Sequence, residues 1–268
     1  MDSEGQKAHS LTSKKQIYKQ SLALRNQRKL YNLQNKYYDD TFGSSIDRYC
    51  EIAFRLKDSK RVLDVGAGSG LLLSLLYELG HECYAIDVND LPKMYAPEIF
   101  SGKKIDFKIC NVEVDDMPYP DNYFDAVVCS ETLEHFIHSH LNAAKEMHRV
   151  LRSGGICIIT APNAVSFRNR SRMLRGKNIT WDYEKHYLDA EPVIYRGLSF
   201  YPDRHNREFT INELKLLMER AGFKNVNVYL FQSRKYRIGI DRIKSIGSEL
   251  RDLIPSLRKT LFAVGNKK

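Results

Sequence analysis

Short apolar segments alternate with amphipathic ones along the middle of the chain. The apolar segments have strand length and cover residues 61–66, 82–87, 104–110, 123–130 and 155–162. Segments 69–80 and 139–151 have helix length, and the first stops at Gly80, a residue type that commonly ends helices. Strands that alternate with helices pair in parallel and need cover on both faces. The pattern therefore predicts an α/β fold with a parallel sheet between two helical layers.

The alternation is absent from the N-terminal part of the chain. Residues 1–43 are polar and basic with only weak helical periodicity, so we predict an arm that is partly disordered or folded as a helical lid. A helical pattern begins near residue 44 and runs to Arg55. We therefore place a single domain at residues 44–268.

The alternation is also interrupted near the C-terminus. Residues 163–208 are polar and rich in Tyr and Arg, and a loop region of this length usually covers a binding site. A helix then begins at Thr210, which has an acid three residues further on, as in a capping box. Apolar segments at 225–231 and 259–265 predict two more strands, and the basic segment 233–258 between them predicts a helical insertion.

Charge is the one unusual feature of the composition. The 268 residues include 42 Lys and Arg against 33 Asp and Glu, a net charge of +9. Basic residues are concentrated in residues 1–38, in 168–177 and in the tail from Arg234. Such stretches attract nucleic acid, anionic lipid or a phosphate-bearing substrate, and the alternative for each is an ordinary solvated surface.

No feature of the sequence indicates secretion or a membrane span. The apolar runs are too short to cross a bilayer, and the first residues lack the apolar core of a signal peptide. Five cysteines show no paired spacing, and four lie in strand-like segments, which predicts buried free thiols. The expected location is cytoplasmic, with peripheral contact at the inner face of a membrane as an option.

The segment "VLDVGAGSG" (62–70) joins a predicted strand to a predicted helix. Glycines at 66, 68 and 70 let the backbone turn sharply and approach a ligand closely. Asp87, at the end of the next strand, is suited to accept hydrogen bonds from ribose hydroxyls. A dinucleotide site would need G-x-G-x-x-G, which is missing here. Asp64 disfavours a pyrophosphate but suits a ligand that carries an ammonium.

These motifs resemble those of the class I S-adenosylmethionine-dependent methyltransferases. The glycine loop, "AIDV", "NVEVDDMPYPDNYFDAVVCSETLEHF" and "RVLRSGGICIITAPN" occur in the family's order, and the resemblance covers roughly residues 44–231. It implies a Rossmann-like, seven-stranded, mostly parallel sheet whose last strand is antiparallel. By motif it also implies cofactor contacts from Asp64, Gly66, Gly68, Asp87, Asn111, Val112 and Ser130, with Asn111 standing where the family usually has Asp.

The segment "SETLEHF" (130–136) carries the candidate chemistry. On a helical turn Glu131, Glu134 and His135 share one face and can converge on one point. An ExxEH pattern followed by a later histidine, here His205, resembles ubiquinone-type catechol O-methyltransferases and small-RNA 3′-terminal 2′-O-methyltransferases. That resemblance implies a Mg²⁺, Mn²⁺ or Zn²⁺ ion held by these four residues.

Other interpretations of this segment stay open. The acids can be the polar start of a helix, and His205 can bond a backbone group. His135 can act as general base without a metal, with Glu131 as a second catalytic group. His186 is a rival ligand or base.

The predicted substrate follows from the 163–208 insertion, which should cover the acceptor. Its aromatic residues stack on rings or sugars and its arginines bind phosphate; they include Trp181, Tyr183, Tyr187, Tyr195 and Tyr201. We expect O-methylation of a hydroxyl on a small molecule or saccharide, with a vicinal diol as the common acceptor feature. The alternatives are 2′-O-methylation of an RNA 3′ end and an inactive, cofactor-binding partner subunit.

Overall fold

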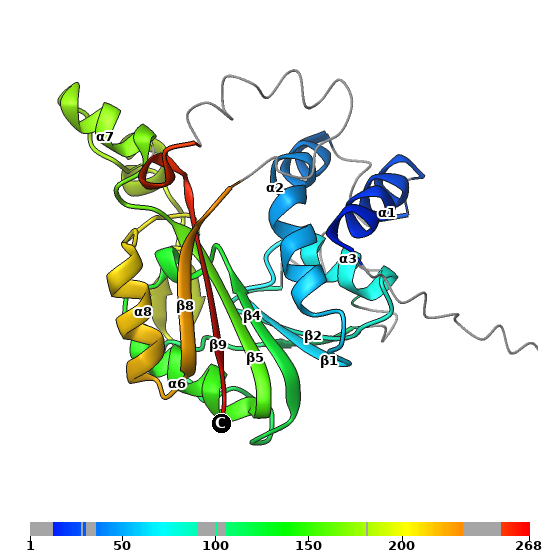
Figure 1. Ribbon diagram of the computed structural model, residues 1–268. Helices are drawn as coiled ribbons and strands as arrows, with labels where there is room; N and C mark the ends of the chain where they lie inside the picture. The colour runs from blue at the N-terminus through cyan, green and yellow to red at the C-terminus, as the bar shows by residue number, and fades with distance from the viewer. Residues whose placement is uncertain are drawn as a thin grey trace, which may run out of the picture.

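The computed structural model describes residues 13–27, 29–30, 36–90, 100, 105–180, 182–232 and 253–268. A seven-stranded sheet forms its centre, in the order β3-β2-β1-β4-β5-β9-β8 (Figure 1). The strands are β1 (Arg61–Val65), β2 (Glu82–Asp87), β3 (Asp106–Ile109), β4 (Phe124–Ser130), β5 (Leu151–Pro162), β8 (Lys224–Phe231) and β9 (Thr260–Asn266).

The last strand of the chain runs against its neighbours. Strand β9 pairs antiparallel with both β5 and β8, whereas β1 to β5 pair in parallel. This confirms the predicted sheet, including the antiparallel last strand. The carboxyl ends of the parallel strands therefore lie at one edge, where open α/β sheets bind ligands.

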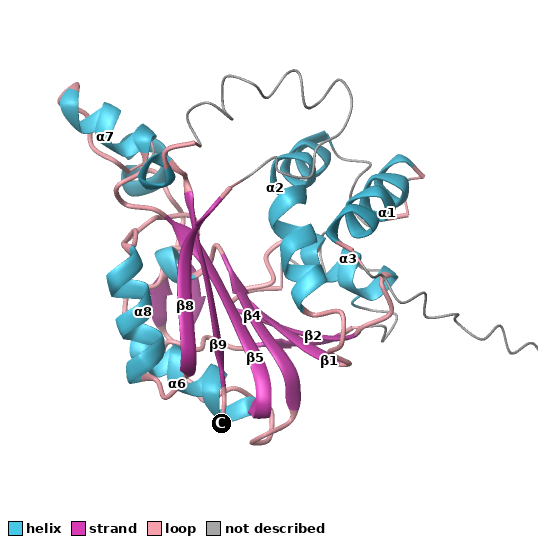
Figure 2. Ribbon diagram, viewed as in Figure 1, coloured by secondary structure: helices cyan, strands magenta, loops and turns pink. Residues whose placement is uncertain are grey.

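Helices cover both faces of the sheet (Figure 2). On one face lie α1 (Lys14–Asn26), α2 (Lys36–Arg55) and α3 (Leu71–Glu78), and on the other α6 (His140–Val150) and α8 (Ile211–Arg220). The buried strand β1 shows why both layers are needed. Its Val62 packs in the hydrophobic cluster with α1, α2 and α3, and its Leu63 packs in the cluster on the other face with α6 and α8. Thr210 and Glu213 form the predicted capping box of α8.

The N-terminal helices extend further back than the periodicity suggested. Helix α2 begins at Lys36, ahead of the expected start near residue 44, and so crosses the boundary drawn between residues 43 and 44. Helix α1 buries Ile17 and Tyr18 in the same cluster as α2. The buried Glu51 carboxylate of α2 holds the two helices together, because it accepts a 2.5 Å hydrogen bond from Lys14.

The 163–208 insertion has more regular structure than a loop. It contains α7 (Phe167–Leu174), the π-helix η2 (Glu184–Leu188) and the hairpin β6 (Val193–Tyr195)–β7 (Leu198–Phe200). The hairpin turns through Arg196 and Gly197, both at positive φ, which suits a two-residue hairpin loop. Trp181 and residues 233–252 of the basic insertion lie outside the described residues.

Two further predictions concern cysteines and membrane spans. All five cysteines are buried and unpaired, as the spacing indicated. Among the described helices, none combines the length and apolar character required to cross a bilayer.

Candidate active site

The glycine loop between β1 and α3 uses its glycines for different reasons. Gly66 has φ of +78°, and a Cβ there would lie 2.2 Å from Cγ2 of Thr132, so only glycine fits. Gly68 has φ of +53°, and a Cβ there would meet nothing within 4 Å. Gly68 lines a cavity of about 260 Å³, so its missing side chain leaves room for a ligand.

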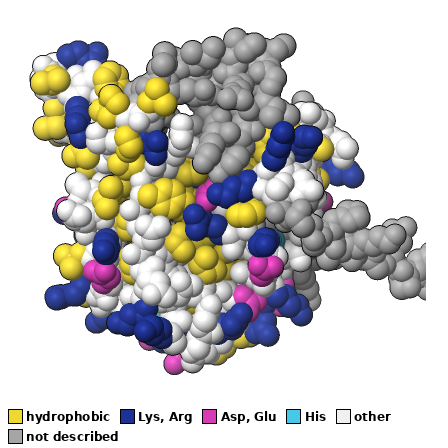
Figure 3. Space-filling view, viewed as in Figure 1, with side chains coloured by type: hydrophobic (Ala, Val, Ile, Leu, Met, Phe, Trp, Pro, Cys, Tyr) yellow, Lys and Arg dark blue, Asp and Glu magenta, His cyan; other side chains and the backbone are white. Residues whose placement is uncertain are grey.

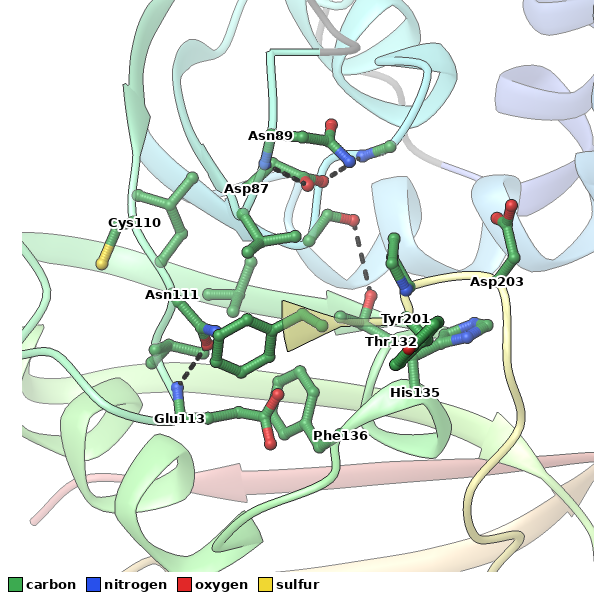
Figure 4. Close-up of a pocket in the computed structure, with 18 of the residues that line it drawn as sticks. Asp87, Asn89, Cys110, Asn111, Glu113, Thr132, His135, Phe136, Tyr201 and Asp203 are labelled. Carbon is green, nitrogen blue, oxygen red and sulfur yellow. Dashed lines mark hydrogen bonds between the residues drawn. The ribbon is translucent and has the colours of Figure 1, made fainter. Parts of the chain in front are cut away.

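Asp87 lies at the carboxyl end of β2 and holds the loop in place. Its carboxylate accepts hydrogen bonds from the backbone N–H groups of Gly68 (2.8 Å) and Asn89 (3.3 Å), shown as dashed lines in Figure 4. Burial raises the pKa of this carboxyl group above its usual range. Asp87 therefore has the position expected of a ribose acceptor, on the wall of the cavity.

The cavity wall beyond β3 carries the predicted adenine residues. Asn111 and Val112 both line the cavity and are buried. The side-chain oxygen of Asn111 accepts a hydrogen bond from the N–H of Glu113 (3.0 Å), and its Nδ2 has no hydrogen-bond partner. A buried amide donor without a partner is costly, and it suits a site where a ligand supplies the acceptor.

Two predicted cofactor residues lie elsewhere. Ser130 shares a 3.0 Å hydrogen bond with Thr160 and does not line the cavity, where Thr132 takes that place. Asp64 is buried and does not line the cavity either. Its Oδ1 atom has no hydrogen-bond partner among the described residues. Burial and the neighbouring Asp87 raise the pKa of Asp64 to about 8.

The opposite wall of the cavity carries the "SETLEHF" segment and the end of the insertion. In Figure 4, Asn111 and Glu113 lie on one side and Thr132, His135 and Tyr201 on the other. Phe200 at the end of β7 and residues 201–203 after it complete this wall. The insertion therefore covers part of the cavity.

Three of the four predicted metal ligands converge. Candidate ligand atoms of Glu134, His135 and His205 all lie within 4.8 Å of one another. Glu134 is 1% exposed, and one of its carboxylate oxygens has no hydrogen-bond partner. Burial, and then the charge of Glu131, raise the pKa of Glu134 well above its usual range. Cation binding would relieve this cost.

The imidazole of His135 is oriented for ligation or base catalysis. Its Nδ1 donates a 2.8 Å hydrogen bond to the carbonyl oxygen of Arg204, which leaves the lone pair of Nε2 available. Burial, and then the neighbouring His205, lower the pKa of His135 to about 4. The ring is therefore neutral at pH 7.

Glu131 lies at the edge of this cluster. It has φ of +55°, an uncommon backbone conformation for a residue with a side chain, and it lines the cavity. One carboxylate oxygen is 3.6 Å from the guanidinium of Arg48, and the other has no hydrogen-bond partner. Glu131 is outside the group of three convergent ligands but close enough to raise the pKa of Glu134.

Sequence reasoning missed two charged neighbours. Arg48, from α2, has a largely buried side chain and is the cation nearest Glu131. Glu208 is buried, and its carboxylate is 3.6 Å from Nδ1 of His205. Glu208 was visible as an acid three residues after His205, whereas nothing in the pattern of α2 connected Arg48 with the site. The rival His186 lines a neighbouring cavity and is not in the cluster.

Comparison with protein families identifies the family of the chain that carries this cavity. A methyltransferase-domain family model matches residues 36–228. The chain belongs to this family. It is a class I S-adenosylmethionine-dependent methyltransferase, as the motifs predicted, and the cofactor of its family is S-adenosylmethionine.

Individual relatives are distant. The ubiquinone/menaquinone biosynthesis C-methyltransferase UbiE of Nitrosospira multiformis is 25% identical over 211 residues, 74% of this chain and 81% of that protein. Two solved methyltransferase structures share the fold. The one from Archaeoglobus fulgidus has a TM-score of 0.53 and 19% identity, with coverage of 86% of this chain and 100% of that chain. The one from Thermotoga maritima has a TM-score of 0.51 and 21% identity, with coverage of 87% of this chain and 95% of that chain. None of these likenesses identifies the acceptor or a metal.

Proposed function

We propose that this methyltransferase O-methylates a vicinal diol on a small molecule or saccharide, assisted by a divalent cation. The observation that carries the proposal is the convergence of Glu134, His135 and His205 beside the cofactor cavity. His135 and Glu131 line the cavity together with residues 200–203 of the insertion, so an acceptor in this part of the cavity would lie close to the cluster.

The donor set fits a hard or borderline cation. Carboxylate oxygens combined with imidazole nitrogen suit Mg²⁺, Mn²⁺ or Zn²⁺. Glu134 would supply an oxygen, and His135 and His205 would supply nitrogens, while Glu131 lies at the edge of this group. When bound, such an ion acts as a Lewis acid that lowers the pKa of a coordinated hydroxyl and orients a diol.

The reaction itself asks little of the protein. The acceptor oxygen attacks the methyl carbon of the sulfonium, the carbon–sulfur bond breaks, and S-adenosylhomocysteine leaves. Placing the oxygen in line with that bond supplies most of the acceleration. Glu131 lines the cavity and is positioned to accept the hydroxyl proton. Without a cation, Nε2 of His135 takes that role.

One further candidate has a specific observation behind it. The quinone-pathway C-methyltransferase relatives favour methylation of a ring carbon in a quinone precursor. That reaction also needs a base but transfers the methyl group to carbon, so the product keeps its free hydroxyls. A methylated diol, by contrast, resists cleavage by periodate.

The test is isothermal titration with S-adenosylhomocysteine and then with Mg²⁺, Mn²⁺ and Zn²⁺. We expect a metal heat that disappears in Glu134→Ala and His205→Ala and persists in the matched control His186→Ala. Cofactor-product binding without any metal response would refute the cation and leave His135 as base. Labelled methyl transfer to ribonucleosides, followed by periodate, reports O-methylation of the 2′,3′-diol. For catechols and hexoses, the NMR signal of the transferred methyl group separates a methoxy product from a carbon-bound methyl product.

A further inference from the structure

Helix α7 exposes its apolar side chains and buries a polar one. Phe167 and Leu174 are 49% and 88% exposed, and their spacing of seven residues puts them on one face. The one buried residue of α7 is Asn169. Its Nδ2 donates to the carbonyl oxygens of residues 163 and 164 and to the carboxylate of Glu208. The inward face is thus satisfied by hydrogen bonds, and the apolar side chains of the outward face are largely left exposed.

The exposed apolar surface continues onto the neighbouring segment. The 3₁₀-helix η3 (Pro255–Leu257) contacts α7, and Asn163 donates a 2.8 Å hydrogen bond to the carbonyl oxygen of Arg258 beyond it. We define the α7 patch by its exposed apolar residues, which are Val165, Phe167, Met173, Leu174, Leu253 and Ile254. Figure 3 shows apolar side chains, with Lys and Arg among them, on the projecting lobe at the upper left that Figure 1 labels α7.

The two segments that form the α7 patch carry basic residues and no acidic ones. Residues 163–180 contain five Lys and Arg and no acid, and residues 253–259 contain two and no acid. Arg170 and Arg175 are exposed and donate to the carbonyl oxygens of Val165 and Ser171. Within the described part of the chain neither forms an ion pair. No acidic group of the described residues therefore offsets the charge of these two arginines.

We propose that the α7 patch docks the protein on an anionic lipid bilayer. Aliphatic tips ringed by basic residues match an interface in which the tips enter the headgroup region and the cations meet lipid phosphates. A surface built for single-stranded nucleic acid would present several aromatic faces for base stacking, whereas Phe167 is the one aromatic residue of the α7 patch. A patch of this kind on a monomer marks an interaction site.

The position of the α7 patch also indicates the class of acceptor, an inference that rests on the proposed function. Helix α7 follows the carboxyl end of β5, the edge of the sheet where the cavity opens. Asn169 at its core bonds Glu208, which lies 3.6 Å from His205. Docking through α7 therefore brings the candidate cluster to the membrane surface, and the acceptor class becomes a hydroxyl on a lipid-anchored molecule.

The experiment is sedimentation of the full chain with vesicles of phosphatidylcholine, alone or mixed with phosphatidylglycerol. We expect binding to the mixed vesicles only. Phe167→Ser/Leu174→Ser should lower the partition coefficient at least about tenfold through lost apolar burial. Arg170→Gln/Arg175→Gln should lower the partition coefficient about 25-fold, because each cation near an anionic surface contributes about fivefold. Matched controls outside the α7 patch are Leu216→Ser, an exposed leucine of α8, and Arg220→Gln, which should bind as the unmodified chain does.

Several outcomes would overturn the docking proposal. One is equal binding to neutral vesicles, and another is binding that both α7 double variants retain. A third is no vesicle binding combined with an RNA affinity that falls in Arg170→Gln/Arg175→Gln, which would make the patch a nucleic-acid surface. A fourth is a dimer that Leu174→Ser dissociates. Binding of S-adenosylhomocysteine, measured in parallel, reports on the methyltransferase site separately, because the substitutions lie outside the cavity.

Discussion

The two glycines of the cofactor loop should respond differently to the same substitution. In Gly66→Ala the new Cβ would lie 2.2 Å from Cγ2 and 2.5 Å from Oγ1 of Thr132, at a φ of +78°. The left-handed backbone costs about 1–2 kcal/mol, and overpacking adds about 1–3 kcal/mol. In Gly68→Ala only the backbone cost of about 1–2 kcal/mol applies, because the Cβ meets nothing within 4 Å.

Urea unfolding and cofactor-product titration together separate the two effects. Gly66→Ala should lose about 3 kcal/mol of unfolding free energy, and Gly68→Ala about 1 kcal/mol. Binding of S-adenosylhomocysteine should nevertheless fall strongly in Gly68→Ala, because the methyl group enters the cavity that Gly68 lines.

A second-site substitution tests the physical reason. Thr132→Ala removes both atoms nearest to the new Cβ and leaves the Cβ of residue 132, at 2.9 Å. Gly66→Ala/Thr132→Ala should therefore be more stable than the two single losses predict, by at least about 1 kcal/mol. Equal losses for the two glycine variants, or strict additivity in this cycle, would refute the account of the loop.

Two more predictions concern charge. The pKa of Asp64 is raised to about 8 in the fold, against 3.8 for an unperturbed side chain, so the folded state binds the proton more tightly. The contribution of Asp64 to the unfolding free energy is therefore largest below the unperturbed pKa of 3.8. It falls by about 1.4 kcal/mol per pH unit as the pH rises toward the folded-state pKa of about 8. From pH 5 to 7 the unfolding free energy should fall by about 3 kcal/mol relative to Asp64→Asn, and parallel profiles would contradict this. Asp115 accepts a hydrogen bond from the hydroxyl of Tyr195 and forms a 2.8 Å ion pair with Arg196. Both contacts hold the β6–β7 hairpin beside the cavity wall that carries Asn111 and Val112. Asp115→Ala should weaken S-adenosylhomocysteine about 5- to 30-fold, whereas the exposed neighbour in Asp116→Ala should leave it unchanged; equal effects would sink the idea of a latch.

The sheet could be predicted because its information is local. The buried strand β1 has apolar residues at three of its five positions, Val62, Leu63 and Val65, and Gly66 and Gly68 mark the turn that follows it. The N-terminal helices were predicted poorly because their stability comes from tertiary contacts. Helix α1 is polar on average, and its few buried side chains, such as Ile17 and Tyr18, gain their stability only against α2.

Residue types at the site were predictable, but their exact contacts were not. The spacing predicted that Glu131, Glu134 and His135 share one face, and the structure brings Glu134 and His135 together with His205 but leaves Glu131 outside this group. Ser130 points its hydroxyl to Thr160, and Thr132, two residues further on, lies on the cavity wall. Glu131 between them has a positive φ, which has no signature in the sequence.

The approach of His205 to His135 depends on backbone groups, which explains why no pattern predicts its geometry. The carbonyl oxygen of Glu134 accepts from the N–H groups of Asn206 (2.7 Å) and Arg207 (3.2 Å). The Asn206 amide donates to the carbonyl oxygen of His135 (2.8 Å). Such bonds form between any residues that reach the right backbone positions, and they fix two segments about seventy residues apart in the chain. The two histidine rings are thereby held with centroids 4.9 Å apart by the fold itself. These backbone bonds hold the cluster together, and the fold bears the cost of burying Glu134. That is the arrangement expected of a site whose ligand restores the lost charge balance.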